Sequence, residues 1–148
     1  MSIFKQSFSF SIQVYDSASE LAVSDRFLLE KAQKISENAH SPYSKFQVGA
    51  AILLENGEIV CGNNQENAAY PSGLCAERTA IFWCSANYPN QRILKIAIAA
   101  KPKNSSDFVS VTPCGSCRQS MLEYEVKQLS DIELIMQSEH GKIYVIPS

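Results

Sequence analysis

The sequence has no long apolar run and no surplus of positive charge, and each absence narrows the possible functions. No stretch of its 148 residues approaches the roughly 20 apolar residues that a membrane-spanning helix needs. Its 13 Lys and Arg against 15 Asp and Glu give a formal net charge of −2, which supplies no basic face for a phosphate backbone. We therefore expect neither a membrane nor a nucleic-acid partner, and a small molecule is the favoured ligand.

Secretion signals and a disulfide framework are also missing. The N-terminal stretch MSIFKQSFSFSIQVYD alternates serine with apolar residues instead of forming a continuous apolar core, so it is not expected to be a signal peptide. We expect a cytoplasmic protein. An odd number of cysteines in a reducing compartment favours metal binding, a reactive thiol or core packing over disulfides. The five are Cys61, Cys75, Cys84, Cys114 and Cys117.

Hydrophobic periodicity predicts a single α/β domain over residues 1–148, with an N-terminal extension over residues 1–18. Phe8, Phe10, Ile12 and Val14 alternate with polar residues and predict a strand, and helical spacing predicts a helix over 19–38 with a Ser or Asp cap. The other expected elements are two strands around an Asn56-Gly57 turn, a helix at 75–88, a strand at 93–100, a helix at 114–129 and strands at 132–137 and 143–146.

This order, β-α-ββ-α-β-α-ββ, implies helices packed on a mixed sheet. We expect a three-layer α/β/α sandwich with roughly five strands in the sheet, and the N-terminal strand in addition.

Cysteines occur at two predicted helix starts. Cys114 and Cys117 are three residues apart directly after Pro113, so their sulfurs lie on one side of the first turn and can bind one ion. Alone, C-x-x-C fits a redox dithiol or half of a structural zinc site. With Cys75 from another helix start, it fits three ligands of a zinc ion whose fourth position is open to water. Helix N-termini favour thiolates through their free N–H groups and dipole.

Glu77 makes the third possibility an enzyme hypothesis. It follows Cys75 by two residues, so its carboxylate can reach a water on the metal and carry that water's proton to a leaving group without binding the metal. Three thiolates leave a zinc cluster at about −1, which weakens its action on water unless a cation offsets the charge. Arg78 is placed to do so, and Arg118 is a second candidate. C-x-E followed by P-C-x-x-C is the general signature of zinc-dependent deaminases.

Three segments together resemble the small cytidine deaminase family: PYSKFQVGAAIL, GNNQENAAYPSGLCAERTA and TPCGSCRQ, within residues 41–124. The resemblance implies a zinc-dependent homotetramer of pyrimidine salvage, with one Zn²⁺ per subunit and sites shared between subunits. Its reaction would be the hydrolytic deamination of cytidine and 2′-deoxycytidine to uridine and 2′-deoxyuridine, with release of ammonia. The resemblance further implies that Cys75, Cys114 and Cys117 bind zinc, and that Glu77 shuttles protons between the water, pyrimidine N3 and the leaving amine.

Substrate contacts follow from the same resemblance. It implies that the peptide N–H of Ala76 holds the base, that Asn64 and Glu66 bind the ribose hydroxyls, and that Phe46 faces the pyrimidine ring. A carboxylate at the sugar, buried in a small site, disfavours a phosphate there because two like charges would meet at low dielectric. An aromatic ring can stack on the planar base. Free nucleosides are therefore the expected substrates.

Alternatives remain open from the residues alone. Cys61 and Cys84 are expected to be ordinary buried thiols, but either could be a fourth zinc ligand, which would make the site closed and structural and leave Glu77 without a role. A deaminase of another nucleoside-like substrate or of a polynucleotide is the other alternative. The charge balance and Glu66 disfavour the polynucleotide.

The sequence departs from the family pattern at both ends. Family members usually continue past the last strand into a segment with a Leu-Leu-Pro element and an aromatic residue that reaches a neighbouring active site, whereas this sequence stops at Pro147-Ser148. We therefore expect the C-terminal family segment to be missing. The FSFSIQV stretch precedes the matching part. It is expected to extend the sheet or contribute to assembly, and to be covered, because a free strand edge promotes aggregation.

Overall fold

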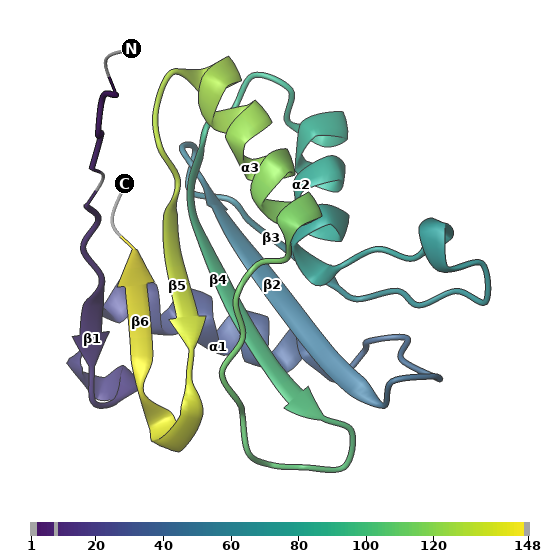
Figure 1. Ribbon diagram of the computed structural model, residues 1–148. Helices are drawn as coiled ribbons and strands as arrows, with labels where there is room; N and C mark the ends of the chain where they lie inside the picture. Colours follow the sequence, from purple (N-terminus) through teal and green to yellow (C-terminus); the bar gives the residue numbers. More distant parts are fainter. Residues whose placement is uncertain (1–2, 8, 147–148) are drawn as a thin grey trace.

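A mixed sheet of six strands forms the middle layer of the computed structural model, which describes residues 3–7 and 9–146 (Figure 1). The strand order is β1-β6-β5-β4-β2-β3; β4 and β5 run parallel, and the other neighbours are antiparallel. The strands are β1 (Gln13–Tyr15), β2 (Phe46–Leu54), β3 (Ile59–Asn63), β4 (Ile93–Pro102), β5 (Glu133–Gln137) and β6 (Ile143–Ile146). The predicted α/β class and order of elements are confirmed. The sheet has six strands because the N-terminal strand joins it.

Helices cover both faces of this sheet. In Figure 1, α1 (Val23–Ser36) lies behind the strands, and α2 (Ala76–Asn87) and α3 (Gly115–Gln128) lie in front. Each face has its own apolar core. One core joins α2 and α3 to the sheet around Ile81, Ile96 and Ile98, and the other joins α1 around Leu28 and Ile135. Short 3₁₀ turns cover Ala18–Glu20, Tyr70–Ser72 and Glu139–Gly141. None of the helices in the described part of the chain is long and apolar enough to cross a bilayer.

The central strands β2 and β4 are apolar along most of their length because helices cover both of their faces. Ala50, Ala51 and Ile52 of β2 are fully buried, as are residues 96–100 of β4. The hairpin from β2 to β3 turns at Asn56-Gly57, as predicted. Gly57 has a φ of +86°, which favours glycine, and the Asn56 side chain accepts a hydrogen bond from the Glu58 N–H at 3.1 Å.

Two details of the N-terminal part differ from the predictions. The α1 helix begins after Ala22 and has no side-chain cap, because a separate 3₁₀ turn takes up Ser19 and the helix already contains Ser24 and Asp25. The N-terminal strand is also shorter than predicted. Only Gln13–Tyr15 pair with β6, while Phe10 and Ile12 are not in a strand, and the predicted strand position Phe8 lies outside the described residues.

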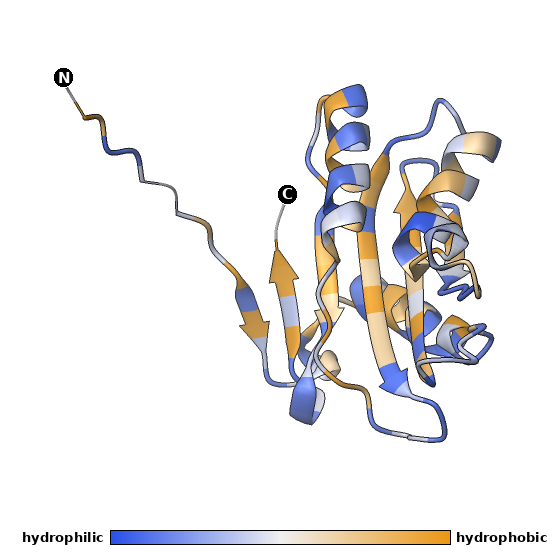
Figure 2. Ribbon diagram, turned by 45° about the vertical axis from the view of Figure 1, so that its right-hand side comes forward, coloured by the Kyte–Doolittle hydropathy of each residue, from blue (hydrophilic) through white to orange (hydrophobic). Residues whose placement is uncertain are grey.

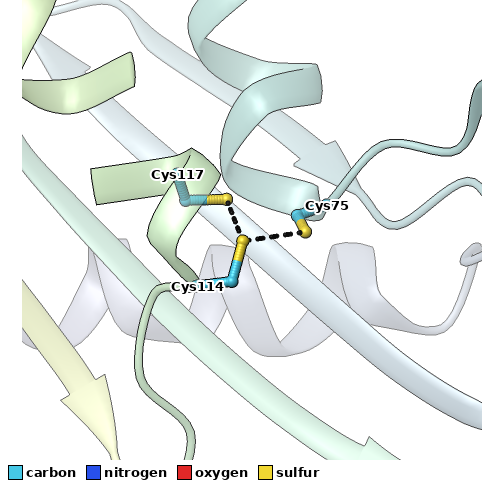
Figure 3. Close-up of side chains that lie close together, drawn as sticks. All are labelled: Cys75, Cys114 and Cys117. Carbon is cyan, nitrogen blue, oxygen red and sulfur yellow. Dashed lines mark hydrogen bonds between the residues drawn. The ribbon is translucent and has the colours of Figure 1, made fainter. Parts of the chain in front are cut away.

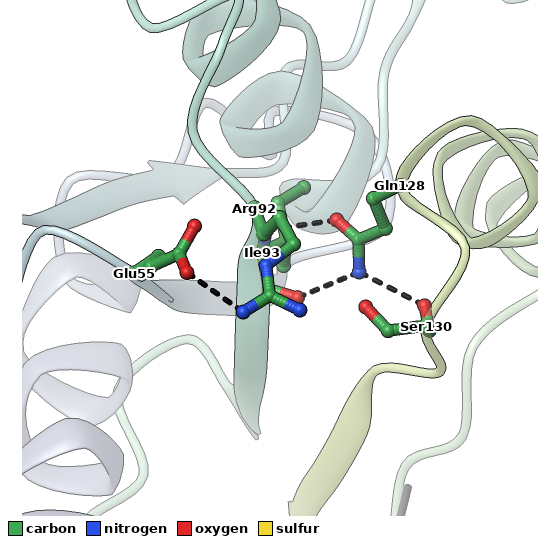
Figure 4. A network of polar contacts seen from close by, with 5 residues as sticks. All are labelled: Glu55, Arg92, Ile93, Gln128 and Ser130. Atoms are coloured by element: carbon green, nitrogen blue, oxygen red, sulfur yellow. Dashed lines mark hydrogen bonds and ion pairs between the residues drawn. The ribbon is translucent and has the colours of Figure 1, made fainter.

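Gln128, the last residue of α3, fixes this helix to the beginning of β4 (Figure 4). Its side-chain oxygen accepts a hydrogen bond from the Ile93 N–H at 2.9 Å, and its nitrogen donates to the carbonyls of Ile93 at 2.9 Å and Ser130 at 3.0 Å. Arg92 next to it forms a 2.7 Å ion pair with Glu55, but both side chains are about half exposed, so this pair adds little to stability. The amide network therefore sets the position of α3 relative to the sheet.

Replacing Gly62 with alanine should lower the free energy of unfolding by about 1–3 kcal/mol. A Cβ atom at Gly62 in β3 would lie 2.7 Å from the backbone N of Ala80 and 2.8 Å from the carbonyl O of Ala76, so α2 would have to move away from the sheet. Urea denaturation measures the change. Gly115→Ala is the matched control, because the nearest atom to its added Cβ is 4.0 Å away. Equal stability of the two variants would contradict the close approach of α2 to β3.

Candidate active site

Three cysteine sulfurs meet where the N-termini of α2 and α3 face each other (Figure 3). Cys75 is the residue before the first turn of α2, Cys114 stands in the same position at α3, and Cys117 lies in the first turn of α3. The Sγ atom of Cys114 lies 3.6 Å from that of Cys75 and 3.5 Å from that of Cys117. All three sulfurs lie within 4.8 Å of one another. The structure thus brings together the three residues that the sequence predicted as zinc ligands.

The spacing of the sulfurs fits a tetrahedral metal ion. A Zn–S bond of about 2.3 Å places two sulfurs of a tetrahedron about 3.8 Å apart, close to the two measured separations. In the described part of the chain, this trio is the group of His, Cys, Asp and Glu side chains with metal-binding geometry, and it does not include Cys61 or Cys84. The residues therefore fit zinc with three thiol ligands and one free position.

The two remaining cysteines differ from each other. Cys84 is buried in the core between α2 and the sheet, as expected. Cys61 is exposed, so the prediction that it is a buried thiol is wrong. It lies in β3, which forms one edge of the sheet, and an edge strand is covered less completely by the flanking helices.

Cys75 and Cys117 have strongly perturbed pKa values because these two thiols titrate together. A hydrogen bond with Cys117 and the nearby Arg78 lower the pKa of Cys75 to about 5, against the opposing effect of burial. The interaction with Cys75, followed by burial, raises the pKa of Cys117. The nearby Arg78 therefore favours the thiolate form of Cys75.

Of the two predicted charge-compensating arginines, one contacts the thiols. Arg78 Nη2 lies 3.9 Å from the Sγ atom of Cys75, within reach of a charge-assisted contact. Arg118 instead donates a hydrogen bond to the carbonyl of Pro113 at 3.1 Å, because its side chain turns back along the segment that leads into α3. Arg118 thus holds the loop before Cys114 in place.

Glu77 is a buried carboxyl group in the first turn of α2, with 3% of its surface exposed. Burial is the largest cause that raises its pKa, and the negative charge of Cys75 raises it further. A carboxyl group whose pKa is raised toward neutrality can both accept and return a proton at physiological pH. These are the properties expected of a proton shuttle next to the thiol cluster.

Asn64 and Glu66 hold the segment that carries Phe46. The Asn64 side chain accepts from the Val48 N–H at 2.8 Å and donates to the Phe46 carbonyl at 3.0 Å. Glu66 Oε2 accepts from the N–H groups of residues 43 and 44 at 2.8 and 3.3 Å. Glu66 is only partly buried in the single chain, contrary to the expectation of a buried carboxylate, because the loop around it projects from the sheet.

Thr79 is a positioning residue that the sequence reasoning missed. Its hydroxyl donates a hydrogen bond to the Cys75 carbonyl at 3.1 Å and so ties the first turn of α2 to the residue that bears the thiol. The signal was present, because a threonine four residues after a helix-capping position commonly bonds back in this way.

Three thiols on two helix starts, with a buried glutamate beside one of them, define the class of zinc-dependent deaminases. The family model described as "Cytidine and deoxycytidylate deaminase zinc-binding region" matches residues 22–130, which include all three cysteines and Glu77. The chain belongs to this family and is an enzyme of the deaminase type. The predicted family is confirmed.

Similar proteins support the same assignment. A cytidine deaminase of Halalkalibacterium halodurans is 42% identical over 98 residues, which cover 66% of this chain and 70% of the relative. One from Sporosarcina psychrophila is 44% identical over 98 residues, covering 66% of this chain and 67% of the relative. The crystal structure of cytidine deaminase from Burkholderia pseudomallei superposes with a TM-score of 0.68 at 34% identity, covering 82% of this chain and 90% of that one.

Proposed function

We propose that the chain hydrolyses the bond between C4 and the exocyclic amine of cytidine and 2′-deoxycytidine, giving uridine and 2′-deoxyuridine with release of ammonia. The observation that carries this proposal is the meeting of Cys75, Cys114 and Cys117 beside the buried Glu77. These cysteines would bind one zinc ion per subunit, and zinc, when bound, makes water acidic enough to act as a nucleophile near neutral pH. Arg78 would offset part of the thiolate charge.

Glu77 would move the protons of the reaction. Its carboxylate takes a proton from the attacking water and passes it to pyrimidine N3 as the water oxygen adds to C4. It then carries the second proton to the amine, which leaves as ammonia, and the carboxylate is regenerated. The raised pKa of Glu77 supports both directions of transfer. The N–H of Ala76 in the first turn of α2 lies among the N–H groups that helical hydrogen bonds leave free, and we assign it to the base.

The ribose would bind at Asn64 and Glu66, with Phe46 against the ring. Glu66 uses Oε2 for the backbone of residues 43 and 44, and Oε1 makes no hydrogen bond within the described residues, so one oxygen remains for a sugar hydroxyl. Hydrogen bonds with the Ser44 side chain and the Tyr43 N–H lower the pKa of Glu66, so it is ionised at neutral pH. A negative charge at this place favours a hydroxyl over a phosphate.

The resemblance to the small cytidine deaminases extends the proposal to a single domain that acts in pyrimidine salvage in the cytoplasm as a homotetramer with shared sites. Exposed aromatic residues support contacts between subunits. Tyr70, in the loop between β3 and α2, is 91% exposed, and Trp83 on α2 is 50% exposed. Aromatic side chains are enriched at protein–protein interfaces. Sedimentation of the purified protein measures the number of subunits.

Free nucleosides should be deaminated at least about tenfold more efficiently than their monophosphates, because Glu66 repels a phosphate. The loss of ultraviolet absorbance and the release of ammonia measure kcat/KM for cytidine, 2′-deoxycytidine, CMP, dCMP and single-stranded DNA. Glu66→Gln should narrow the difference between nucleosides and monophosphates, while Glu58→Gln, on the exposed hairpin turn, should not. If dCMP or DNA is the better substrate for the parent protein, the proposed substrate is wrong. If no cytosine compound is deaminated, the proposed reaction is wrong as well.

A further inference from the structure

The N-terminal arm, residues 3–7 and 9–12, extends away from the rest of the molecule and leads into β1 (Figure 2). It exposes large apolar side chains: Ile3 is 87% exposed, Phe4 92%, Phe10 83% and Ile12 43%. The family match begins at residue 22, so the arm lies outside the part that matches the family. Nothing in the reaction proposed above uses it.

The arm continues the outermost strand of the sheet. β1 stands at one end of the strand order and pairs only with β6 among the described strands, so its outer edge offers unpaired backbone N–H and C=O groups. The antiparallel register pairs Gln13 with Val145 and Tyr15 with Ile143. Continued by one residue, this register would place Ile12 opposite Ile146, the last residue of β6. The rest of the arm runs beyond the end of that strand.

The two faces of the arm differ in character. Tyr15 points to the face that α1 covers and packs against its core. Val14 points to the opposite face and is 56% exposed, and if β1 is extended toward the N-terminus, the alternation of a strand places Ile12 and Phe10 on this same face. Figure 1 shows no helix in front of β1 and β6, within the described part of the chain, on this side of the sheet. An extended β1 would therefore carry the apolar side chains of Phe10, Ile12 and Val14 on one face and the serines 9 and 11 on the other.

The arm also lacks the features by which edge strands usually avoid pairing. Residues 3–15 contain no proline and a single charged residue, Lys5. Two copies of residues 9–15 that run antiparallel about a two-fold axis at Ile12 would place Ile12 opposite Ile12 and Phe10 opposite Val14, so apolar side chains would face apolar ones. The two Lys5 residues would then lie about 48 Å apart along the strands, at 3.4 Å per residue, and would not repel each other.

We propose that this arm is a self-association element, and that residues 9–15 pair antiparallel with the same residues of a second copy of the chain, joining two sheets into one. Within this segment Phe10 is 83% exposed, Val14 56% and Ile12 43%, and the pairing would cover these apolar side chains. A membrane partner is disfavoured because Lys5 is the arm's only cation.

Two measurements on the full-length protein test this pairing. Sedimentation velocity over a wide range of protein concentration gives the assembly mass, and amide hydrogen exchange gives the protection of residues 9–15. The double variant Phe10→Ser with Ile12→Ser removes two of the apolar side chains on one face, and Ser9→Thr with Ser11→Thr is its matched control on the other face. We expect the apolar double variant to have about half the parent's mass and roughly tenfold faster exchange in the arm. The control should behave like the parent.

Other outcomes would overturn the pairing. The arm would not be the contact if parent and apolar double variant had the same mass, or if the arm exchanged as fast in the parent as in the variant at every concentration. A mass that grows with concentration without a plateau would mean open-ended pairing instead of a two-fold contact. Unchanged circular dichroism and an unchanged melting temperature of the variants establish that the domain remains folded, so the result does not depend on the proposed substrate.

Discussion

Replacing Glu77 with glutamine should lower kcat/KM for cytidine by roughly 10²–10⁴-fold while the zinc content stays unchanged. Glutamine has nearly the same shape as glutamate, so the buried space that Glu77 occupies stays filled. Its amide cannot accept the proton of the attacking water or carry a proton to the leaving amine. The substitution therefore removes proton transfer by this side chain and leaves the three thiols in place. Steady-state kinetics and metal analysis of the same preparation measure the two effects.

The activity of Glu77→Gln should fall, but its free energy of unfolding should stay the same or rise. Burial raises the pKa of Glu77 in the folded state, so the folded protein binds this proton more tightly than the unfolded chain does. The Glu77 contribution to stability therefore decreases as the pH rises from the unfolded pKa through the folded pKa. At neutral pH the buried carboxylate opposes folding, and Glu77→Gln should melt at the same temperature as the parent or higher.

A matched control separates the role of Glu77 from a simple loss of charge. Glu123→Gln makes the same change on the exposed face of α3 and should keep full activity. Near-parental activity of Glu77→Gln would show that another group moves the proton. Equal losses of activity and zinc in that variant would show that Glu77 supports the metal instead of the chemistry.

Much of the fold follows from the sequence because its elements have clear periodicities. The apolar runs of β2 and β4, the Asn56-Gly57 turn and the amphipathic helices each carry a local signal, and each forms close to where it was expected, although α1 begins at Val23 instead of residue 19. The order of the strands carries no such signal. That β6 lies between β1 and β5 depends on which edges pair in three dimensions, and the length of β1 depends on where β6 ends.

In the site as well, short motifs identify residues, whereas the directions of their neighbours' side chains depend on the three-dimensional structure. Cys75, Glu77, Cys114 and Cys117 could be identified because each pair stands in a short motif at a helix start. The directions of long side chains could not be predicted in this way. Arg78 and Arg118 each stand next to a residue of the site, yet one contacts a thiol and the other a backbone carbonyl. Cys61 is exposed because β3 became an edge strand.

Replacing Cys114 with serine should reduce bound zinc from about one ion per chain to a small fraction and remove deaminase activity. Cys114 stands between the other two thiols, at 3.6 and 3.5 Å, so its loss leaves no set of three sulfurs around one point. Cys61→Ser is the matched control, because it replaces another exposed thiol outside the cluster. This control should keep both zinc and activity, as measured by metal analysis and the cytidine assay.

Thermal melting with and without a chelator then measures how much bound zinc stabilises the folded protein, and the zinc content of further cysteine variants distinguishes an open site from a closed one. Zinc at 100 times its dissociation constant stabilises the folded state by about 2.7 kcal/mol, so a chelator should lower the melting temperature of the parent and of Cys61→Ser. It should leave Cys114→Ser unchanged, because that variant has no zinc to lose. A Cys61→Ser or Cys84→Ser variant that loses zinc as completely as Cys114→Ser would identify a fourth thiol ligand. The position that the proposed reaction needs for water would then be filled, and Glu77 would have no substrate to protonate.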